Sequence, residues 1–311
     1  MFNQLPDSFI LSKAFIQSRQ VGAPMVALES AVITHGLPRP ESLSLAKEME
    51  LIVREHGALP VTIALFEGKI QVGMTDSALE TLANLDDVHK ISLRDFGIAI
   101  ARGWSGGTTV AATLFAAAQA GIRVFATGGI GGVHRGAPFD ISADLPQLGR
   151  TPMIVVCAGA KSILDLPATR EALETQGVPV IGYQTDEFPA FYSRESGLQV
   201  DQRVETPQGV ARIALSAWAA GLQTAILLVV PPPEGFALPH KRIESAIEAA
   251  LEEAQKAGIY GSAITPFLLG RVSQLTEGES LTANIALLRN NAKIAAQVAV
   301  AYQNFRHPKV F

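Results

Sequence analysis

Short runs of apolar, often β-branched residues alternate along this chain with longer segments of helical periodicity. Near-continuous apolar strands separated by helices are typical of a largely parallel sheet that helices cover on both faces. The alternation therefore predicts an α/β protein with three layers, α/β/α. The expected strands lie at 25–28, 123–126, 153–156, 178–181 and 225–230, with a hairpin at 60–72; the expected helices cover 41–56, 108–120, 165–176, 208–220, 241–256 and 281–305.

No low-complexity linker, sharp change of composition or internal repeat divides the sequence. The chain has 311 residues, of which 48% are hydrophobic, and its mean hydropathy is +0.25. A chain of this length and composition can bury a substantial core. We therefore expect residues 1–311 to form a single domain.

Charge and cysteine content exclude several classes of function. The net charge is −4 and no run of lysine or arginine stands out, so we expect no nucleic-acid partner. Cys157 is the only cysteine, which excludes an intramolecular disulfide and a Cys-rich zinc site; its apolar surroundings favour a core residue. We see neither a signal peptide nor about twenty consecutive apolar residues, so we expect a cytoplasmic protein without a membrane span.

Ligands of open α/β sheets bind beyond the carboxyl ends of the strands, so the residues that follow each apolar run matter most. Glu29 follows the first run directly. A carboxylate in that position can have its pKa raised by desolvation, which suits a general acid or base. A solvated loop glutamate is an equally good interpretation of this residue alone.

The segment 127–144 is the richest in polar and glycine residues. It begins at Thr127, has five glycines within nine residues, and continues through His134 and Arg135 to Asp140, Ser142, Ala143 and Asp144. Glycines let the backbone approach a ligand closely, and successive N–H groups can bind an anion. The segment matches neither the dinucleotide fingerprint nor a P-loop. Such a crowd of polar groups in an apolar chain favours a functional loop.

Asp140 and Asp144 offer oxygen ligands that suit Mg²⁺ or Mn²⁺. Two aspartates four residues apart are weak evidence for a metal, because either can cap a following turn instead.

Two lysines are candidates for chemistry. Lys161 follows a buried run and the small residues 158–160, where desolvation would favour a neutral, nucleophilic amine. The alternative is a lysine at a helix start whose head reaches solvent. Lys90 can bind phosphate, although an ordinary surface lysine is the commoner case.

Further polar groups stand at helix ends and within apolar helices. Residues 106–110 open a helix, whose N-terminus at Val110 either holds an anion or is simply capped. Asn284, Asn290 and Asn291 lie in an apolar helical pattern, and a buried asparagine needs a partner from backbone or ligand.

Taken together, these segments resemble the pseudouridine-5′-phosphate glycosidase family over about residues 21 to 305. The motifs that carry the resemblance are VALES at 26–30, TGGIGGVHRGA at 127–137, DISADL at 140–145, VCAGAKSILD at 156–165, IGYQT at 181–185 and TPFLL at 265–269. Several long motifs in one order are far more specific than a single short pattern.

The resemblance implies a role for each matching residue. Glu29 would be the proton donor and Lys161 the nucleophile, and Asp140 would bind Mn²⁺, with Mg²⁺ or another divalent ion as the alternative. Substrate contacts would come from Lys90, Val110, Ser142, Ala143, Asp144, Thr127, His134 and Asn284. The resemblance also implies an α/β/α homotrimer.

Two positions depart from the family pattern. Only Pro138 and Phe139 connect Ala137 to Asp140, about two residues fewer than the pattern has. Leu93 stands where the family commonly has arginine. The shorter connection bears directly on the metal assignment, because it can displace the Asp140 carboxylate.

The implied reaction is the reversible cleavage of pseudouridine 5′-phosphate to uracil and ribose 5-phosphate. The bond to be broken joins two carbons, so protonation of an oxygen leaving group is not available. A lysine that forms an imine with the sugar would meet this need. Two other interpretations remain open, a Schiff-base aldolase acting on a sugar phosphate and a non-catalytic sugar-phosphate sensor.

Overall fold

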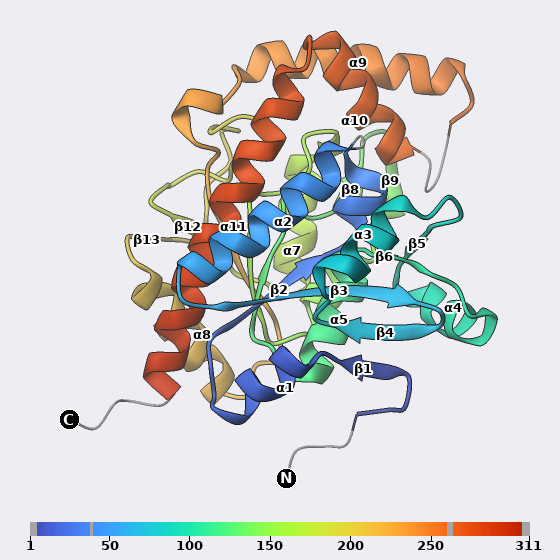
Figure 1. Cartoon of the computed structure of the whole chain (residues 1–311). Coiled ribbons are helices and arrows are strands. Elements are labelled where there is room, and N and C mark those ends of the chain that lie inside the picture. The colour runs from blue at the N-terminus through green and yellow to red at the C-terminus, as the bar shows by residue number, and fades with distance from the viewer. Residues whose placement is uncertain (1–4, 38–39, 260–263, 307–311) are drawn as a thin grey trace.

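A computed structural model describes residues 5–37, 40–259 and 264–306, and its centre is one large sheet between layers of helices (Figure 1). In the described chain this sheet has eleven strands; nine follow the order β1-β4-β3-β2-β7-β10-β14-β12-β13, while β6 pairs with β3 and β5 with β6. These strands are β1 (Phe9–Leu11), β2 (Met25–Glu29), β3 (Leu59–Phe66), β4 (Lys69–Val72), β5 (His89–Ile91), β6 (Gly106–Thr108), β7 (Val124–Ala126), β10 (Ile154–Cys157), β12 (Val180–Tyr183), β13 (Gln202–Val204) and β14 (Ile226–Val229).

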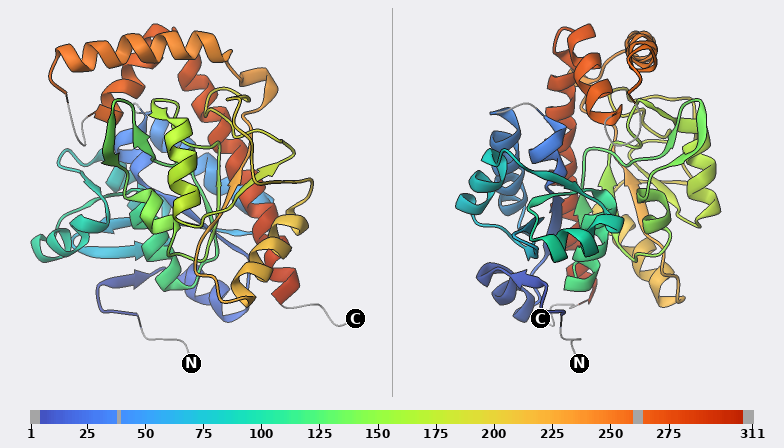
Figure 2. Two further views of the ribbon diagram at one scale, coloured as in Figure 1. Left: turned by 180° about the vertical axis from the view of Figure 1, so that it is seen from behind. Right: turned by 90° about the vertical axis from the view of Figure 1, so that its right-hand side faces the viewer.

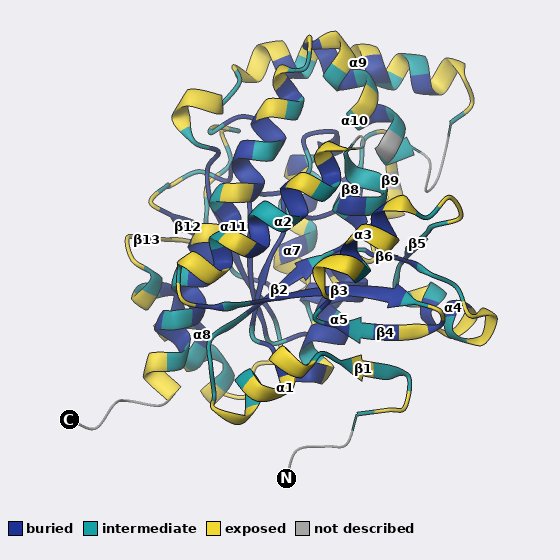
Figure 3. Cartoon of the chain, viewed as in Figure 1, coloured by how far each residue is buried: buried dark blue, intermediate teal, exposed yellow. Residues whose placement is uncertain are grey.

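Most neighbouring strands in this sheet are parallel, whereas β4 and β6 run antiparallel to β3. A separate three-stranded sheet has the order β11-β8-β9, from β8 (Val133–His134), β9 (Ala137–Ile141) and β11 (Leu164–Asp165). The central strands β7, β10, β12 and β14 are buried along their whole length, and the helices expose only their outer sides (Figure 3). The predicted α/β/α architecture is therefore confirmed.

Helices cover both faces of the sheet (Figure 2). The helices α2 and α11 pack on one face, α5 and α7 lie on the other, and α9 and α10 lie at the end where the central strands finish. The α-helices are α1 (Lys13–Gln20), α2 (Glu41–Glu55), α3 (Asp76–Asn84), α4 (Phe96–Arg102), α5 (Val110–Ala120), α6 (Asp144–Leu148), α7 (Leu166–Thr175), α8 (Pro207–Ala219), α9 (His240–Lys256), α10 (Ile264–Leu275) and α11 (Glu279–Arg306). None of the described helices is long and apolar enough to span a membrane.

The sequence predicted most of these elements with small shifts at their ends. The expected strand at 178–181 begins two residues later, at Val180. The N–H of Val178 closes the end of α7 by donating to the Leu173 carbonyl, and Pro179 has no N–H to give to a ladder. The hairpin predicted at 60–72 is present. It turns at Glu67 and Gly68, whose backbone φ angles both lie in the left-handed region.

Three neighbouring parallel strands bring the candidate residues together. Leu28 of β2 pairs with Ala126 of β7, which in turn pairs with Val156 of β10. Because parallel strands end on the same side of a sheet, the residues that follow these three lie close together. They are Glu29, the glycine-rich segment that begins at Thr127, and the turn that carries Lys161.

Gly159, two residues before Lys161, tests how tightly this turn is built. Its φ is +86°, and an added Cβ would lie 2.3 Å from the carbonyl oxygen of Pro189. Gly159→Ala should therefore lower the free energy of unfolding by more than the 1–2 kcal/mol that the left-handed conformation alone costs.

Gly97→Ala is the matched control, because Gly97 lies in α4 with no atom within 4 Å of an added Cβ. That change should stabilise the protein by up to about 1 kcal/mol. Chemical denaturation measures both variants, and equal stability of the two would contradict the described turn.

Candidate active site

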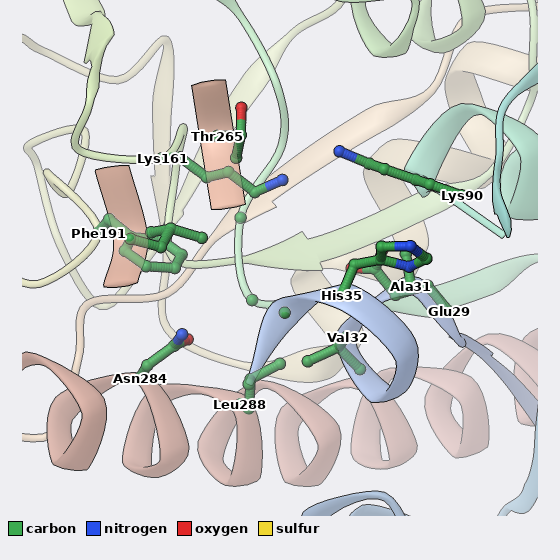
Figure 4. A pocket seen from close by; sticks show the side chains of 14 residues that line it. Glu29, Ala31, Val32, His35, Lys90, Lys161, Phe191, Thr265, Asn284 and Leu288 are labelled. Carbon is green, nitrogen blue, oxygen red and sulfur yellow. The ribbon is translucent and has the colours of Figure 1, made fainter. Parts of the chain in front are cut away.

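A cavity that opens to solvent lies at the carboxyl ends of β2, β7 and β10 (Figure 4). Its wall combines charged groups with apolar and aromatic side chains. The residues that line it are Glu29, Ala31, Val32, His35, Gly36, Lys90, Gly128, Gly129, Lys161, Phe191, Thr265, Leu269, Asn284 and Leu288. A small-molecule site typically has a mostly apolar wall and a small number of polar groups that point into the cavity.

Glu29 is the last residue of β2 and is partly buried in the wall of the cavity. Burial raises the pKa of Glu29, although the charge of Lys161 and a hydrogen bond donated by the Thr127 hydroxyl to Oε1 both act to lower it. The predicted upward shift of the pKa is thus supported by the structure. A glutamate in this state can hold a proton at higher pH than a solvated one and can donate it to a ligand.

Two lysines reach the cavity from different elements, and Figure 4 shows their Nζ atoms pointing toward each other. Lys161 follows β10, and Lys90 lies on β5. Burial lowers the pKa of Lys90, and the nearby charge of Lys161 lowers it further, while Asp144 and Glu29 act in the opposite direction. An anionic ligand between the two lysines would relieve their mutual repulsion.

The glycine-rich segment holds the backbone on which Lys161 sits. The N–H of Lys161 donates to the Ile130 carbonyl at 3.1 Å, and the N–H of Ile130 donates to the Gly159 carbonyl at 3.1 Å. From α11, the Asn291 amide donates to the Thr127 carbonyl at 2.9 Å. Asn291 therefore binds backbone, whereas Asn284 faces the cavity (Figure 4).

Asp144 is buried, with 6% of its surface exposed, and it binds two backbone N–H groups. Its Oδ1 accepts from Ala111 at 2.9 Å and its Oδ2 from Gly131 at 2.8 Å. Ala111 lies in the first turn of α5, so the helix N-terminus, which could hold an anion or be simply capped, holds this carboxylate and is also capped by the Thr109 hydroxyl. The side chain of Asp144 does not cap the turn that follows it; it joins the glycine-rich segment to α5.

Asp140 lies on β9 outside the cavity wall, and its side chain is 51% exposed. Its Oδ2 is 3.2 Å from Nδ1 of His134, whose Nε2 is buried without a hydrogen-bond partner in the part of the chain that the structure describes. Among the residues that the structure describes, no group of three His, Cys, Asp or Glu side chains could hold a metal ion. A single accessible carboxylate fits Mg²⁺ or Mn²⁺ that keeps several water ligands, and it does not fit an ion caged by protein.

The structure thus divides the predicted site residues into two groups. Glu29, Lys90, Lys161 and Asn284 line one cavity, and Thr127 reaches it through Glu29. The others lie outside the cavity wall, on or near the glycine-rich segment and the start of α5: Val110, His134, Asp140, Ser142, Ala143 and Asp144. Cys157 is fully buried in the core, as its surroundings indicated.

Several wall residues were not predicted from the sequence, among them His35, Phe191 and Leu288. His35 lies six residues after Glu29, and burial together with the charge of Lys90 lowers its pKa. Its position in a polar segment directly after a predicted strand was a signal that could have identified it.

Phe191 has a φ of 63°, uncommon for an aromatic residue, and its N–H donates to the Ala158 carbonyl at 3.1 Å. No local sequence pattern marks it.

Comparison with known proteins places the chain in a defined class. Residues 16–301 match the family model described as indigoidine synthase A like protein. The fold is shared with the crystal structure of an indigoidine synthase A-like protein from Thermotoga maritima, at 36% identity and a TM-score of 0.88 over 97% of this chain and 100% of that one. It is also shared with the prealnumycin C-glycosynthase AlnA in complex with ribulose 5-phosphate, at 39% identity and a TM-score of 0.90 over 97% and 99%.

Relatives whose sequences are more similar to this chain define its family more precisely. A pseudouridine-5′-phosphate glycosidase from Caldanaerobacter subterraneus is 54% identical over 89% of this chain and 91% of its own. One from Herpetosiphon aurantiacus is 55% identical over 90% and 93%. This chain belongs to the pseudouridine-5′-phosphate glycosidase family of enzymes, and the resemblance predicted from its motifs is confirmed.

The raised pKa of Glu29 has a measurable effect on stability. A carboxyl whose folded-state pKa is raised contributes stability below its ordinary value, 4.5, and loses it as the pH rises through the raised value. Glu29→Gln stays neutral, so its free energy of unfolding should rise relative to the wild type as the pH rises above 4.5.

Glu244→Gln provides a control of opposite sign, because a hydrogen bond from Arg135 lowers the pKa of Glu244. Glu244 contributes stability above its unfolded-state pKa, and that stability is lost as the pH falls through the lowered value. Unfolding by urea between about pH 2 and pH 8 distinguishes the two, because the Glu244 contribution is lost below 4.5 and the Glu29 contribution above it. A pH-independent difference between Glu29→Gln and wild type would show that the Glu29 carboxylate is not desolvated.

Proposed function

We propose that this protein reversibly cleaves the C–C glycosidic bond of pseudouridine 5′-phosphate, giving uracil and ribose 5-phosphate. The observation that carries the proposal is the meeting of two lysines with a glutamate of raised pKa in one cavity. The proposed substrate comes from relatives that are more than 50% identical to this chain and are named pseudouridine-5′-phosphate glycosidase. The ribulose 5-phosphate complex of the C-glycosynthase AlnA supports a pentose phosphate as a ligand of this fold.

In the proposed mechanism Lys161 attacks C1′ of the ribose while Glu29 protonates the ring oxygen, so the C1′–O bond breaks and the ring opens. The C1′–C5 bond then breaks, its electron pair passing to uracil C5, which takes up a proton, while C1′ becomes an imine with Lys161. Water hydrolyses the imine, releases ribose 5-phosphate and restores the amine. Each step reverses in the synthetic direction.

Other residues of the cavity account for binding. Lys90 faces Lys161 and can pair with the substrate phosphate, and this contact would supply binding energy for the chemical step. Phe191 and Leu288 give one side of the cavity an apolar surface that suits the planar base, and the amide of Asn284 can bond to its edge. Val110, Thr127, His134 and the segment 142–144 are proposed to orient the sugar phosphate through the glycine-rich backbone.

A divalent ion, Mn²⁺ or Mg²⁺, would be held by Asp140 and by water, and when bound it would supply positive charge toward the phosphate. Assembly as a homotrimer and a cytoplasmic location stay predictions of the family resemblance.

Uracil release from pseudouridine 5′-phosphate is the direct test of the function. Wild-type protein should release uracil and form pseudouridine 5′-phosphate from uracil and ribose 5-phosphate. Lys161→Ala should lower kcat by at least about 10³-fold, because it removes the nucleophile. Lys161→Arg is the matched control for charge and should be equally inactive. Uracil release by Lys161→Ala at a rate near that of wild type would contradict the mechanism.

The metal proposal makes a separate prediction. Chelation should suppress turnover and Mn²⁺ should restore it, and Asp140→Asn should weaken the binding of Mn²⁺ measured by electron paramagnetic resonance. Asp76→Asn, on the distant helix α3, is the control and should bind Mn²⁺ as the wild type does. Full activity of protein stripped of metal would rule out a role for the ion.

A further inference from the structure

Arg135 directly follows β8, and its guanidinium binds the main chain just after Lys161. Nη2 donates to the Ser162 carbonyl at 2.9 Å and Nε donates to the Leu164 carbonyl at 3.1 Å. The N–H of Leu164 donates back to the Lys161 carbonyl at 3.0 Å and closes the turn. Arg135 therefore fixes both ends of the short segment that follows the lysine.

Glu244 of α9 holds the guanidinium from the other side. Nη1 of Arg135 donates to Oε1 of Glu244, and Nη2 donates to Oε2 at 3.1 Å. The hydrogen bond from Arg135 lowers the pKa of Glu244, so the carboxylate stays charged at neutral pH. The two side chains are 24% and 31% exposed, which limits screening of the pair by solvent.

We propose that Arg135, oriented by Glu244, is the positioning residue for Lys161. This inference rests on the proposed function, in which Lys161 is the nucleophile. The backbone of Lys161 is bonded to Ile130 on one side, and the turn that follows it is bonded to Arg135 on the other. Both supports come from the glycine-rich segment, so one loop sets where the amine enters the cavity.

A lysine cannot replace Arg135 in this role. The planar guanidinium has five N–H donors in a fixed fork and uses them for two carbonyls and one carboxylate, whereas an ammonium is a compact point charge. Loss of these hydrogen bonds should displace the turn that carries Lys161 and leave the rest of the cavity wall in place. A displacement of about 1 Å at a reacting group can lower the rate about 100-fold.

The test measures how fast borohydride traps ribose 5-phosphate on Lys161 in the full-length protein. Arg135→Ala should trap about 100-fold more slowly than wild type at saturating sugar, and Arg135→Lys should recover little of this loss. Glu244→Gln should lose less, about tenfold, because the carbonyl bonds remain. The KM for pseudouridine 5′-phosphate should change little in all three, and added guanidinium ion should restore part of the rate to Arg135→Ala.

Arg271→Ala is the matched control. Arg271 of α10 forms a comparable two-pronged pair with Glu253 of α9, at 2.5 and 2.8 Å, but does not contact the turn after Lys161. Its trapping rate should equal that of the wild type. An equal loss in Arg271→Ala would show that the docking of α9 is what matters and would overturn the positioning role.

The outcomes separate this inference from the proposed function. Absence of any adduct on Lys161 in the wild type would overturn the proposed function and this inference with it. A wild-type adduct with undiminished trapping in Arg135→Lys and Glu244→Gln would overturn the positioning role alone. These two conservative variants decide the matter if Arg135→Ala does not fold.

Discussion

The carboxylate of Glu29 is held in a place that favours its neutral form, at the end of β2 and next to two lysines. Ionisation there costs desolvation, and the charge of Lys161 offsets part of that cost. The same enclosure favours loss of a proton from Lys90. The cavity wall thus favours a protonated carboxyl at Glu29 and a neutral amine at Lys90 without any contact to ligand.

The position of this cavity follows from strand order. Pairing of β2 with β7 and of β7 with β10 brings residues from three distant parts of the sequence to one edge of the sheet. The glycine-rich segment after β7 lies between the other two and bonds to both Asp144 and the turn of Lys161. Close packing requires glycine in this segment, since a Cβ on Gly131 would lie 2.2 Å from the Ser142 hydroxyl.

The layers, the main strands and the grouping of Glu29 with Lys161 could be predicted from the sequence, because apolar runs and the residues after them are local signals. The burial partners of Asp144 and the contacts of Arg135 could not, because they join segments that only the tertiary fold brings together. Phe191 was missed for the same reason: its ring packs against Gly129 and its N–H donates to the Ala158 carbonyl. Asp140 was assigned by motif, and its exposed place beside His134 depends on a hairpin whose shape the motif does not encode.

Two lysines in one cavity make the identity of the nucleophile the central claim of this account. Lys161 stands on the rigid turn after β10, while Lys90 comes from the short strand β5 on the other side. The most direct measurement is peptide mass spectrometry of protein reduced with borohydride during turnover of pseudouridine 5′-phosphate. We expect a ribose phosphate adduct on the peptide that contains Lys161 and none on the peptide that contains Lys90. An adduct on Lys90, or no adduct during active turnover, would contradict it.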